Sequence, residues 1–394
     1  HGQSRSCPCL GGGAWDTMGC VNNKVAKAKE QRVAKLRRRL SLGEIDAGPD
    51  VDGTVQEEDR SMLMQLSKQQ VLELAKRDDS FSSRKYSVGS ETDHGLHGVA
   101  SFKTKTVKLQ GDQFNAKSEM IGYVCKKGLK PESPNQDDFC IFRVDATSIY
   151  GVFDGHGPSG HDVSNFVQQV LCRNFARHPH FMDNPEKALS DAFVQTQTQC
   201  LECQADGQLD CSLSGTTATL AMLREGVLHM AHVGDSRAVL AKECGTELVS
   251  EDLTHDHKPT CEGEKKRIEA MGGEVRRLDG DIPHRVFLRG KKYPGLAMTR
   301  AIGDSVGATA GVTSIPEVGV FDVREDWRFM LLCSDGVWEF MSSQEAVDTV
   351  SKFSAAEAQK AAEALAVEAW TRWIQEEGNV VDDITVLCAW FHDS

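Results

Sequence analysis

From about residue 100 onward, short apolar runs alternate with turn-forming residues, and longer segments with helical spacing lie between them. Apolar runs of this length bounded by turns predict strands, here at residues 121–125, 139–144, 149–153, 218–223, 227–233, 238–242, 329–333 and 384–390. Apolar residues at helical spacing predict helices at 160–176, 185–204, 261–271 and 354–377, and Ser342 to Glu345 fits a capping box that opens another. Separate helices and strands of this kind predict an α+β layer architecture rather than alternating βαβ units.

The first hundred residues have a different texture. Apolar positions at 25–40 follow helical spacing among basic residues, which predicts an amphipathic helix, and 57–77 predicts another. Residues 78–97 are polar and rich in serine, as in a linker. We therefore expect an N-terminal extension at 1–100 and a folded domain at 101–394.

Composition is that of a globular protein able to bury a core. Of 394 residues 40% are apolar and 26% charged, and no apolar run is long enough to span a bilayer. No secretory signal is visible. The 13 cysteines are scattered, which favours free thiols in a reducing compartment and predicts a cytoplasmic, not secreted, protein. Cys200 and Cys203 form a CxxC pair near Cys211, but no second pair follows, so two thiols on a helix face are favoured over a zinc site.

Charge is distributed unevenly. The net charge of -13 disfavours nucleic-acid binding. Residues 18–40 carry eight basic side chains against one acidic, a charge of +7, which leaves -20 for the rest. If translation began at Met18, Gly19 could be myristoylated and Cys20 palmitoylated, and the basic segment could bind anionic lipid at the inner face of a membrane. Asn23 stands where the usual motif has Ser or Thr, and residues 1–17 would block acylation if retained.

Aspartate follows or precedes several of the apolar runs. Asp154-Gly155 ends the run at 149–153 and is followed by His156-Gly157-Pro158, which cannot be a return strand. Asp335-Gly336 comes just after the run at 329–333, and Asp382 precedes the last strand. Gly234-Asp235-Ser236, in contrast, is followed by a second apolar run, which predicts a hairpin turn there.

Carboxylates gathered at strand ends would repel one another and raise one another's pKa. Bound divalent cations remove that repulsion, and ligand sets made only of oxygen favour Mg²⁺ or Mn²⁺. Two such ions can activate a water and clamp phosphate oxygens. The residues alone therefore indicate a metal-dependent phosphoester hydrolase, with solvated turn aspartates as the alternative.

Eight motifs in order carry a resemblance to a known family. They are NQDD (135–138), VFDGHG (152–157), SGTTA (214–218), VGDSR (233–237), LTHDHKP (253–259), LAMTRAIGD (296–304), LLCSDGVWEFM (331–341) and DDITV (382–386). Together they resemble the metal-dependent protein serine/threonine phosphatases of the PP2C (PPM) family over residues 100–394. The resemblance implies a four-layer α-β-β-α sandwich of two antiparallel sheets flanked by helices, with two Mn²⁺ or Mg²⁺ ions at one end.

The resemblance also implies roles for the site residues. Asp154 would bridge the two ions, the carbonyl of Gly155 and the carboxylates of Asp335 and Asp382 would complete the direct ligands, and Asp137 would act through a bound water. Water between the ions would attack phosphorus in line, and His156 would protonate the departing serine or threonine oxygen.

This chain departs from the family pattern in places. An arginine that holds the substrate phosphate in many members is missing, so Lys126, Lys127 or Lys130 is expected to replace it. Gln136 stands where some relatives have an acid.

Two further aspartates have open roles. A third, weaker ion is possible, with Asp335 and Asp210 the expected pair. Asp304 could be structural, through a bond to Arg300, or functional.

Two hypotheses follow from different classes. The first is an active phosphatase acting on phosphorylated proteins. Its expected partners are those substrates and, through residues 18–40, a membrane surface, and the chain is expected to be monomeric. The second is a pseudophosphatase, a binding module of the same fold. Retention of Asp154, Asp335 and Asp382 favours the enzyme, because a protein without metals has no use for mutually repelling carboxylates.

Overall fold

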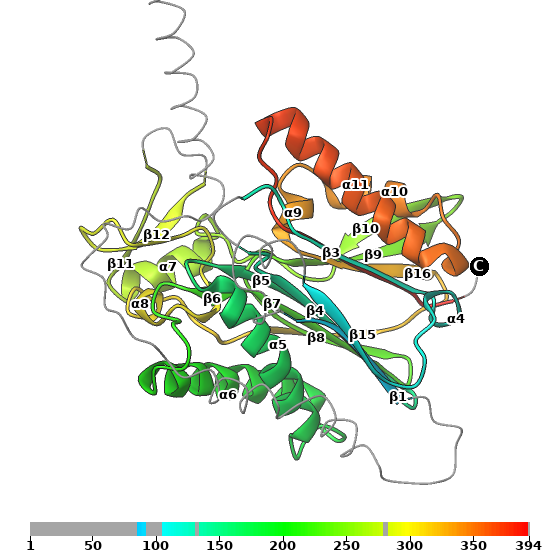
Figure 1. Ribbon diagram of the computed structural model, residues 1–394, viewed down its shortest axis with the longest axis horizontal. Helices are drawn as coiled ribbons and strands as arrows, with labels where there is room; N and C mark the ends of the chain where they lie inside the picture. The colour runs from blue at the N-terminus through cyan, green and yellow to red at the C-terminus, as the bar shows by residue number, and fades with distance from the viewer. Residues whose placement is uncertain (1–84, 92–104, 131–133, 279–282, 393–394) are drawn as a thin grey trace, which may run out of the picture.

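The computed structural model describes residues 85–91, 105–130, 134–278 and 283–392 (Figure 1). Gly19, Cys20 and the helices predicted at 25–40 and 57–77 lie outside these residues and stay predictions. Within the described part, no helix is both long and apolar enough to cross a bilayer.

Two antiparallel sheets form the centre of the molecule. The first has the order β15 (Glu317–Asp322), β8 (Val227–Val233), β7 (Ala218–Arg224), β5 (Thr147–His156), β4 (Asp137–Val144), β1 (Lys85–Glu91) and β2 (Thr106–Gly111), and the short strands β6 (Gly215–Thr216) and β14 (Ile302–Gly303) extend it beyond β5. The second has the order β10 (Glu247–Asp252), β9 (Arg237–Cys244), β16 (Trp327–Cys333), β17 (Ile384–Trp390) and β3 (Ile121–Lys126).

Helices cover the outer face of each sheet (Figure 1). Helices α5 (Gly160–Arg177) and α6 (Pro185–Ala205) pack on the first sheet, whereas α10 (Ser343–Val350) and α11 (Ala358–Glu377) pack on the second. The short helix α4 (Ala116–Glu119) and the 3-10 turn η1 (Ala355–Glu357) lie beside each other. The predicted four-layer α-β-β-α sandwich is confirmed.

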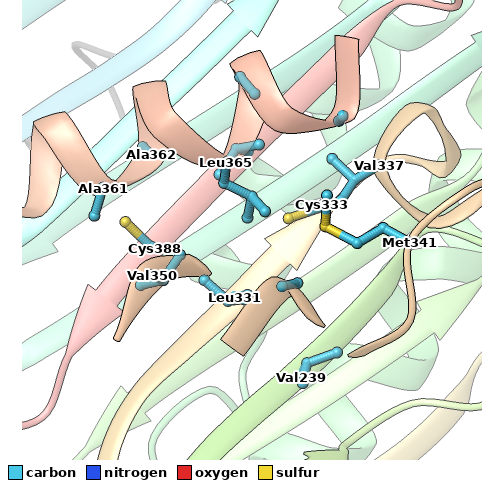
Figure 2. Close-up of a cluster of buried hydrophobic side chains, with 14 of the residues drawn as sticks. Val239, Leu331, Cys333, Val337, Met341, Val350, Ala361, Ala362, Leu365 and Cys388 are labelled. Atoms are coloured by element: carbon cyan, nitrogen blue, oxygen red, sulfur yellow. The ribbon is translucent and has the colours of Figure 1, made fainter. Parts of the chain in front are cut away.

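The central strands of the second sheet, β9, β16 and β17, are buried on both faces, and their side chains alternate between two cores. Leu331 and Cys333 of β16 face the helices, where they pack with Leu365 of α11 (Figure 2). Leu332, between them, packs in the core between the two sheets with residues such as Phe139 of the first sheet. Each sheet is therefore fixed by apolar contacts on both sides, which holds the strand ends of the two sheets in place.

Within the described residues, the eight predicted strands and the helices predicted at 160–176, 185–204, 261–271 and 354–377 are present, with ends shifted by a few residues. The capping box is confirmed: the Ser342 hydroxyl accepts from the backbone N–H of Glu345, and the Glu345 carboxylate accepts from that of Ser342. Cys200, Cys203 and Cys211 are buried in the core beside α6, where burial raises the pKa of each thiol. Burial in this core supports thiols that pack on a helix face rather than a zinc site.

Strand β1 lies inside the segment expected to be a linker, before the boundary expected at residue 101. It pairs with β4 and is fully part of the sheet. Its two buried serines interrupt the hydrophobic pattern. The hydroxyl of Ser90 is satisfied internally, because it donates to Asp138 and accepts from the N–H of Phe139. The folded domain therefore includes Lys85–Glu91.

The hairpin predicted at Gly234-Asp235-Ser236 is wrong. Strand β8 belongs to the first sheet and β9 to the second, so this turn crosses between the sheets. Both strands are buried on both faces, and a continuous apolar run does not reveal which strand it pairs with.

A third, three-stranded sheet lies at one end of the sandwich, on the left of Figure 1. It has the order β11 (Gly273–Arg276), β12 (Arg285–Leu288) and β13 (Pro294–Leu296). Helices α7 (Glu262–Ala270) and α8 (Ser305–Ala308) pack against it. This is the end at which β5, β6 and β14 meet.

Candidate active site

The fold brings four of the predicted aspartates to one end of the two central sheets. Asp137 and Asp154 are directly opposite each other on the antiparallel strands β4 and β5. Asp335 begins helix α9 (Asp335–Trp338) just after β16 ends. Asp382 lies just before β17 begins, and because β16 and β17 are antiparallel neighbours, these two aspartates lie at the same edge.

These carboxylates raise one another's pKa values. Burial and the neighbouring carboxylates, Asp335 and Asp137 first among them, raise the pKa of Asp154 well above its usual range. Burial and Asp382 do the same to the pKa of Asp335. Burial and the charge of Asp383 raise the pKa of Asp137 to about 7. The site therefore holds more negative charge than its own surroundings can stabilise.

In each of the two pairs of adjacent aspartates, Asp137–Asp138 and Asp382–Asp383, the two side chains have different contacts. Asp383 is held by the backbone, its Oδ1 accepting from the N–H of Gly128 at 2.7 Å and its Oδ2 from the N–H of Gln136 at 2.8 Å. Asp382 is left to face the cluster. Asp138, similarly, accepts hydrogen bonds from the hydroxyls of Ser90 and Ser164 and pairs with Lys105.

The side chain of Asp137 lies on the opposite face of β4 from that of Asp138, because successive residues of a strand alternate between faces. Its Oδ2 accepts from the hydroxyl of Ser334 at 2.7 Å, which links β4 to the end of β16. One member of each pair is therefore structural, and the other is available to a ligand.

Gly155, next to Asp154, lies in close contact with the backbone of Gln136 and Gly160. Its N–H donates to the carbonyl of Gln136 at 3.1 Å. A Cβ atom here would lie 2.4 Å from the carbonyl oxygen of Gly160 and 2.5 Å from that of Gln136. Both obstacles are backbone atoms, so a side chain could be accommodated only by moving the strand end. The side chain of Gln136 donates to the carbonyl of Gly157 at 2.7 Å, and so braces the same loop.

His156 forms a buried pair with Asp304, at 2.6 Å from Nε2 to Oδ2. Burial on its own would lower the pKa of His156, but the charge of Asp304 outweighs it and raises this pKa. The other ring nitrogen, Nδ1, is buried without a hydrogen-bond partner among the described residues.

The backbone conformation of Asp304 and the neighbouring Gly215 fix the position of its carboxylate. Its φ of 45° is in the left-handed region, which is uncommon for a residue with a side chain. A Cβ on Gly215 would lie 2.2 Å from Asp304 Oδ2, so the glycine makes room for the carboxylate. The bond to Arg300 that sequence suggested is absent from the described contacts, because Arg300 pairs with Glu264 at 2.7 Å. Asp304 therefore belongs to the site.

Asp235 is a candidate site residue that the prediction of a hairpin at 234–236 missed. It is 1% exposed, its Oδ1 lacks a hydrogen-bond partner among the described residues, and its Oδ2 pairs with Lys258. Its charge contributes to the raised pKa of both Asp154 and Asp335. Lys258 in the motif LTHDHKP, which is half-buried and pairs with Asp235, was the available signal, since a lysine withdrawn from solvent needs a carboxylate partner.

Asp210, the residue expected to join Asp335, is exposed. Its Oδ1 accepts hydrogen bonds from the N–H and hydroxyl of Ser212 at 3.1 and 2.6 Å. The described contacts bring Asp235 to Asp335, and none of them brings Asp210 there.

The three candidate lysines occupy different positions. Lys126 is exposed, with Nζ 3.9 Å from the ring centroid of Trp370. Lys127 donates from Nζ to the carbonyl oxygen of Lys130 at 2.6 Å. Lys130 is buried, and its Nζ pairs with Asp382. Lys130 thus contacts the carboxylate cluster directly.

A second group of metal-ligand type, His232, His257 and Glu317, has ligand atoms within 4.8 Å of one another. The imidazole rings of His232 and His257 are stacked, with their centroids 4.5 Å apart and an angle of 12° between their planes. Nδ1 of His257 accepts from the N–H of Gly234, so its Nε2 must carry the proton in the neutral ring. Nε2 of His232 bonds the carbonyl of His255. These nitrogens already have partners, and we assign the group a structural role.

Comparison with known proteins agrees with this arrangement. A sequence model of the family described as protein phosphatase 2C matches residues 132–377. The chain belongs to the PP2C family.

Several plant members of the PP2C family are similar over most of the chain. Probable protein phosphatase 2C 61 of Arabidopsis thaliana is 35% identical over 322 residues, covering 78% of this chain and 93% of that protein. Probable protein phosphatase 2C 48 of Oryza sativa subsp. japonica is 35% identical over 345 residues, 79% of this chain and 95% of that protein. The fold is also similar to that of a serine-threonine phosphatase 2C from Toxoplasma gondii, with a TM-score of 0.61 and 24% identity, covering 69% of this chain and 94% of that one.

PP2C phosphatases are generally Mn²⁺- or Mg²⁺-dependent, and the residues present here fit such ions. Five carboxylates (Asp137, Asp154, Asp235, Asp335 and Asp382) face two lysines, Lys130 and Lys258. The donors are all oxygen, as these hard cations require. The unpartnered Oδ1 of Asp235 is a buried acceptor without a donor, which an ion or its water would satisfy.

Metal-free protein should lose stability as pH rises. The pKa of Asp137 is raised from 3.8 to about 7 in the folded protein, so its contribution to stability is present below about pH 4 and is lost as pH passes 7. Thermal unfolding in EDTA should therefore show a lower midpoint at pH 7.5 than at pH 5.5, and Mn²⁺ should restore it. Asp137→Asn should flatten the dependence. A midpoint that is insensitive to both pH and Mn²⁺ would contradict the assignment.

Proposed function

We propose that this member of the PP2C family is an active phosphatase that hydrolyses phosphoserine and phosphothreonine in proteins with the aid of two divalent cations. The observation that carries the proposal is the group of mutually repelling carboxylates Asp137, Asp154, Asp335 and Asp382, whose pKa values are all raised. Such a group destabilises the fold unless cations neutralise it. A binding module that has no catalytic metal gains nothing from it.

Asp154, Asp335 and Asp382, with the carbonyl of Gly155, would hold two Mn²⁺ or Mg²⁺ ions, and Asp137 would act from behind them through water. When bound, such ions lower the pKa of water to make a nucleophile and neutralise the charge of the phosphate. For a third ion, Asp335 with Asp235 is the pair supported by the contacts, in place of Asp335 with Asp210.

His156 would protonate the departing oxygen of serine or threonine. The alkoxide of either residue is a poor leaving group, so a positioned acid accelerates its departure. Asp304 supports this role by holding Nε2 of the imidazole at 2.6 Å. It would act as a positioning residue, through its contact with the histidine.

Lys130 would bind the substrate phosphate in place of the missing arginine. Burial would lower its pKa, but the carboxylates of Asp382 and Asp383 more than reverse this, so the amine is charged. A phosphate placed beside Asp382 would lie within reach of the same ammonium group. An ammonium is a point charge and cannot form the paired hydrogen bonds of a guanidinium, so this chain would hold phosphate less rigidly than relatives with arginine.

Turnover should require both the metal and its ligands. With a phosphoserine peptide and Mn²⁺ we expect hydrolysis that EDTA abolishes and added Mn²⁺ or Mg²⁺ restores. Asp335→Asn should lower kcat on the order of a thousandfold or more, because a lost ligand removes several kcal/mol of transition-state stabilisation. Asp322→Asn, on the exposed end of β15, is the matched control and should keep full activity. Absence of metal-dependent turnover, or full activity in Asp335→Asn, would favour the pseudophosphatase.

The role of His156 should depend on the leaving group. p-Nitrophenolate departs without a proton, whereas a serine alkoxide does not. His156→Asn should therefore slow phosphopeptide hydrolysis by roughly 10²–10⁴-fold and p-nitrophenyl phosphate hydrolysis much less. Asp304→Asn should show the same selective pattern in weaker form. Equal losses on both substrates would mean that the pair only supports the local structure.

A further inference from the structure

The turn between β12 and β13 concentrates positive charge on a chain whose net charge is -13. Arg289, Lys291 and Lys292, which we call the basic turn, are all exposed. Residues 273–296 carry six basic side chains and three acidic ones, a charge of +3. Because the net charge of the whole chain is -13, the rest of the chain carries -16.

Many exposed cations elsewhere have a carboxylate partner, which is the ordinary arrangement of a solvated surface. Examples are the pairs Lys187–Asp191, Lys265–Glu269, Lys266–Glu262 and Lys360–Glu357. The described residues provide no such ion-pair partner for Arg289, Lys291 or Lys292. Three like charges within four positions repel one another, and an acidic partner would relieve that repulsion.

The basic turn is held in a defined shape. Gly290 has a φ of +70°, and the N–H of Lys291 donates to the carbonyl of Leu288 at 2.9 Å. The N–H of Gly290 donates to Glu274 of β11 at 3.3 Å. Arg276 of β11 donates to the carbonyl of Lys291. The backbone is anchored while the three cationic side chains remain free to contact a partner, so binding would order little of the chain.

The three-stranded sheet adjoins the catalytic histidine. Helix α8 contacts both β12 and β13 and begins directly after Asp304, its N-cap residue, which pairs with His156. Strand β14, just before α8, pairs with β6, and β6 pairs with β5 at His156. Figure 1 shows β11, β12 and α8 at the end of the sandwich where these strands meet. A segment of substrate next to the phosphorylated residue could extend over this sheet.

We propose that the basic turn is a docking surface for acidic residues that flank the phosphoserine or phosphothreonine of the substrate. This rests on the proposed function, since it assigns a preference to the same site. Acidic flanks would be steered towards the basic turn and away from the acidic remainder of the surface. Substrate selection would therefore depend on charge near the phosphate and on salt.

The test compares two phosphoserine peptides that differ only in flanking residues, one with glutamates and one with glutamines. The wild-type protein should show a kcat/KM about tenfold higher for the acidic peptide at low salt, as two or three exposed charge pairs can provide. High salt should remove the preference. In the variant Arg289→Gln/Lys291→Gln/Lys292→Gln the ratio should fall to about one. The matched control Lys187→Gln/Lys360→Gln, which removes exposed lysines elsewhere, should keep it.

The ratio of the kcat/KM values for the two peptides is insensitive to a general folding defect, because such a defect would lower both values together. Equal kcat/KM values in the wild type, or a preference that persists in the triple variant, would overturn the proposal. If neither peptide is hydrolysed, the proposed function fails, and fluorescence anisotropy of the same labelled peptides still decides this inference by the same ratio. Equal handling of both peptides, with binding to phosphatidylserine vesicles that the triple variant loses, would assign the basic turn to a lipid surface instead.

Discussion

Repulsion among aspartates at one end of the two central sheets is the constraint on which the rest of this structure depends. Carboxylates such as Asp154 and Asp335 lie where burial and like charge both oppose ionisation. The two lysines beside them, Lys130 and Lys258, neutralise only part of the charge. Divalent cations bound among these carboxylates would complete the arrangement, and in the proposed function the same cations would supply the chemistry of phosphoester hydrolysis.

The surrounding fold holds the cluster together against that repulsion. Asp383 joins the start of β17 to the backbone at Gly128 and Gln136, and Ser334 joins the end of β16 to Asp137. Apolar layers on both faces of each sheet keep the strand ends in register. The polar contacts position individual side chains, while the apolar layers prevent the strand ends from moving apart.

The general layout could be predicted from the sequence because it follows from local patterns. Continuous apolar runs identified eight strands, and aspartates without a return strand after them identified Asp154 and Asp335 as ligand candidates. Strand β1 could not be found this way, since buried serines interrupt its apolar pattern, and Ser90 is satisfied by contacts with Asp138 and Phe139, distant in sequence.

Partners across the chain were likewise beyond the sequence pattern. An apolar run shows that a strand is buried but not which sheet it joins, so the crossover at Asp235 resembled a hairpin. Asp304 pairs with a histidine that is 148 positions away, and nothing near it in the chain distinguishes that partner from Arg300. The choice of Lys130 among three lysines likewise required the position of Asp382.

Anomalous diffraction from crystals grown with Mn²⁺ and phosphate would test the central claim most directly. The account predicts manganese peaks within coordination distance of Asp154, Asp335 and Asp382, with Lys130 released from Asp382 and directed at the phosphate. Crystals without manganese at these carboxylates, in which Lys130 still pairs with Asp382, would contradict it.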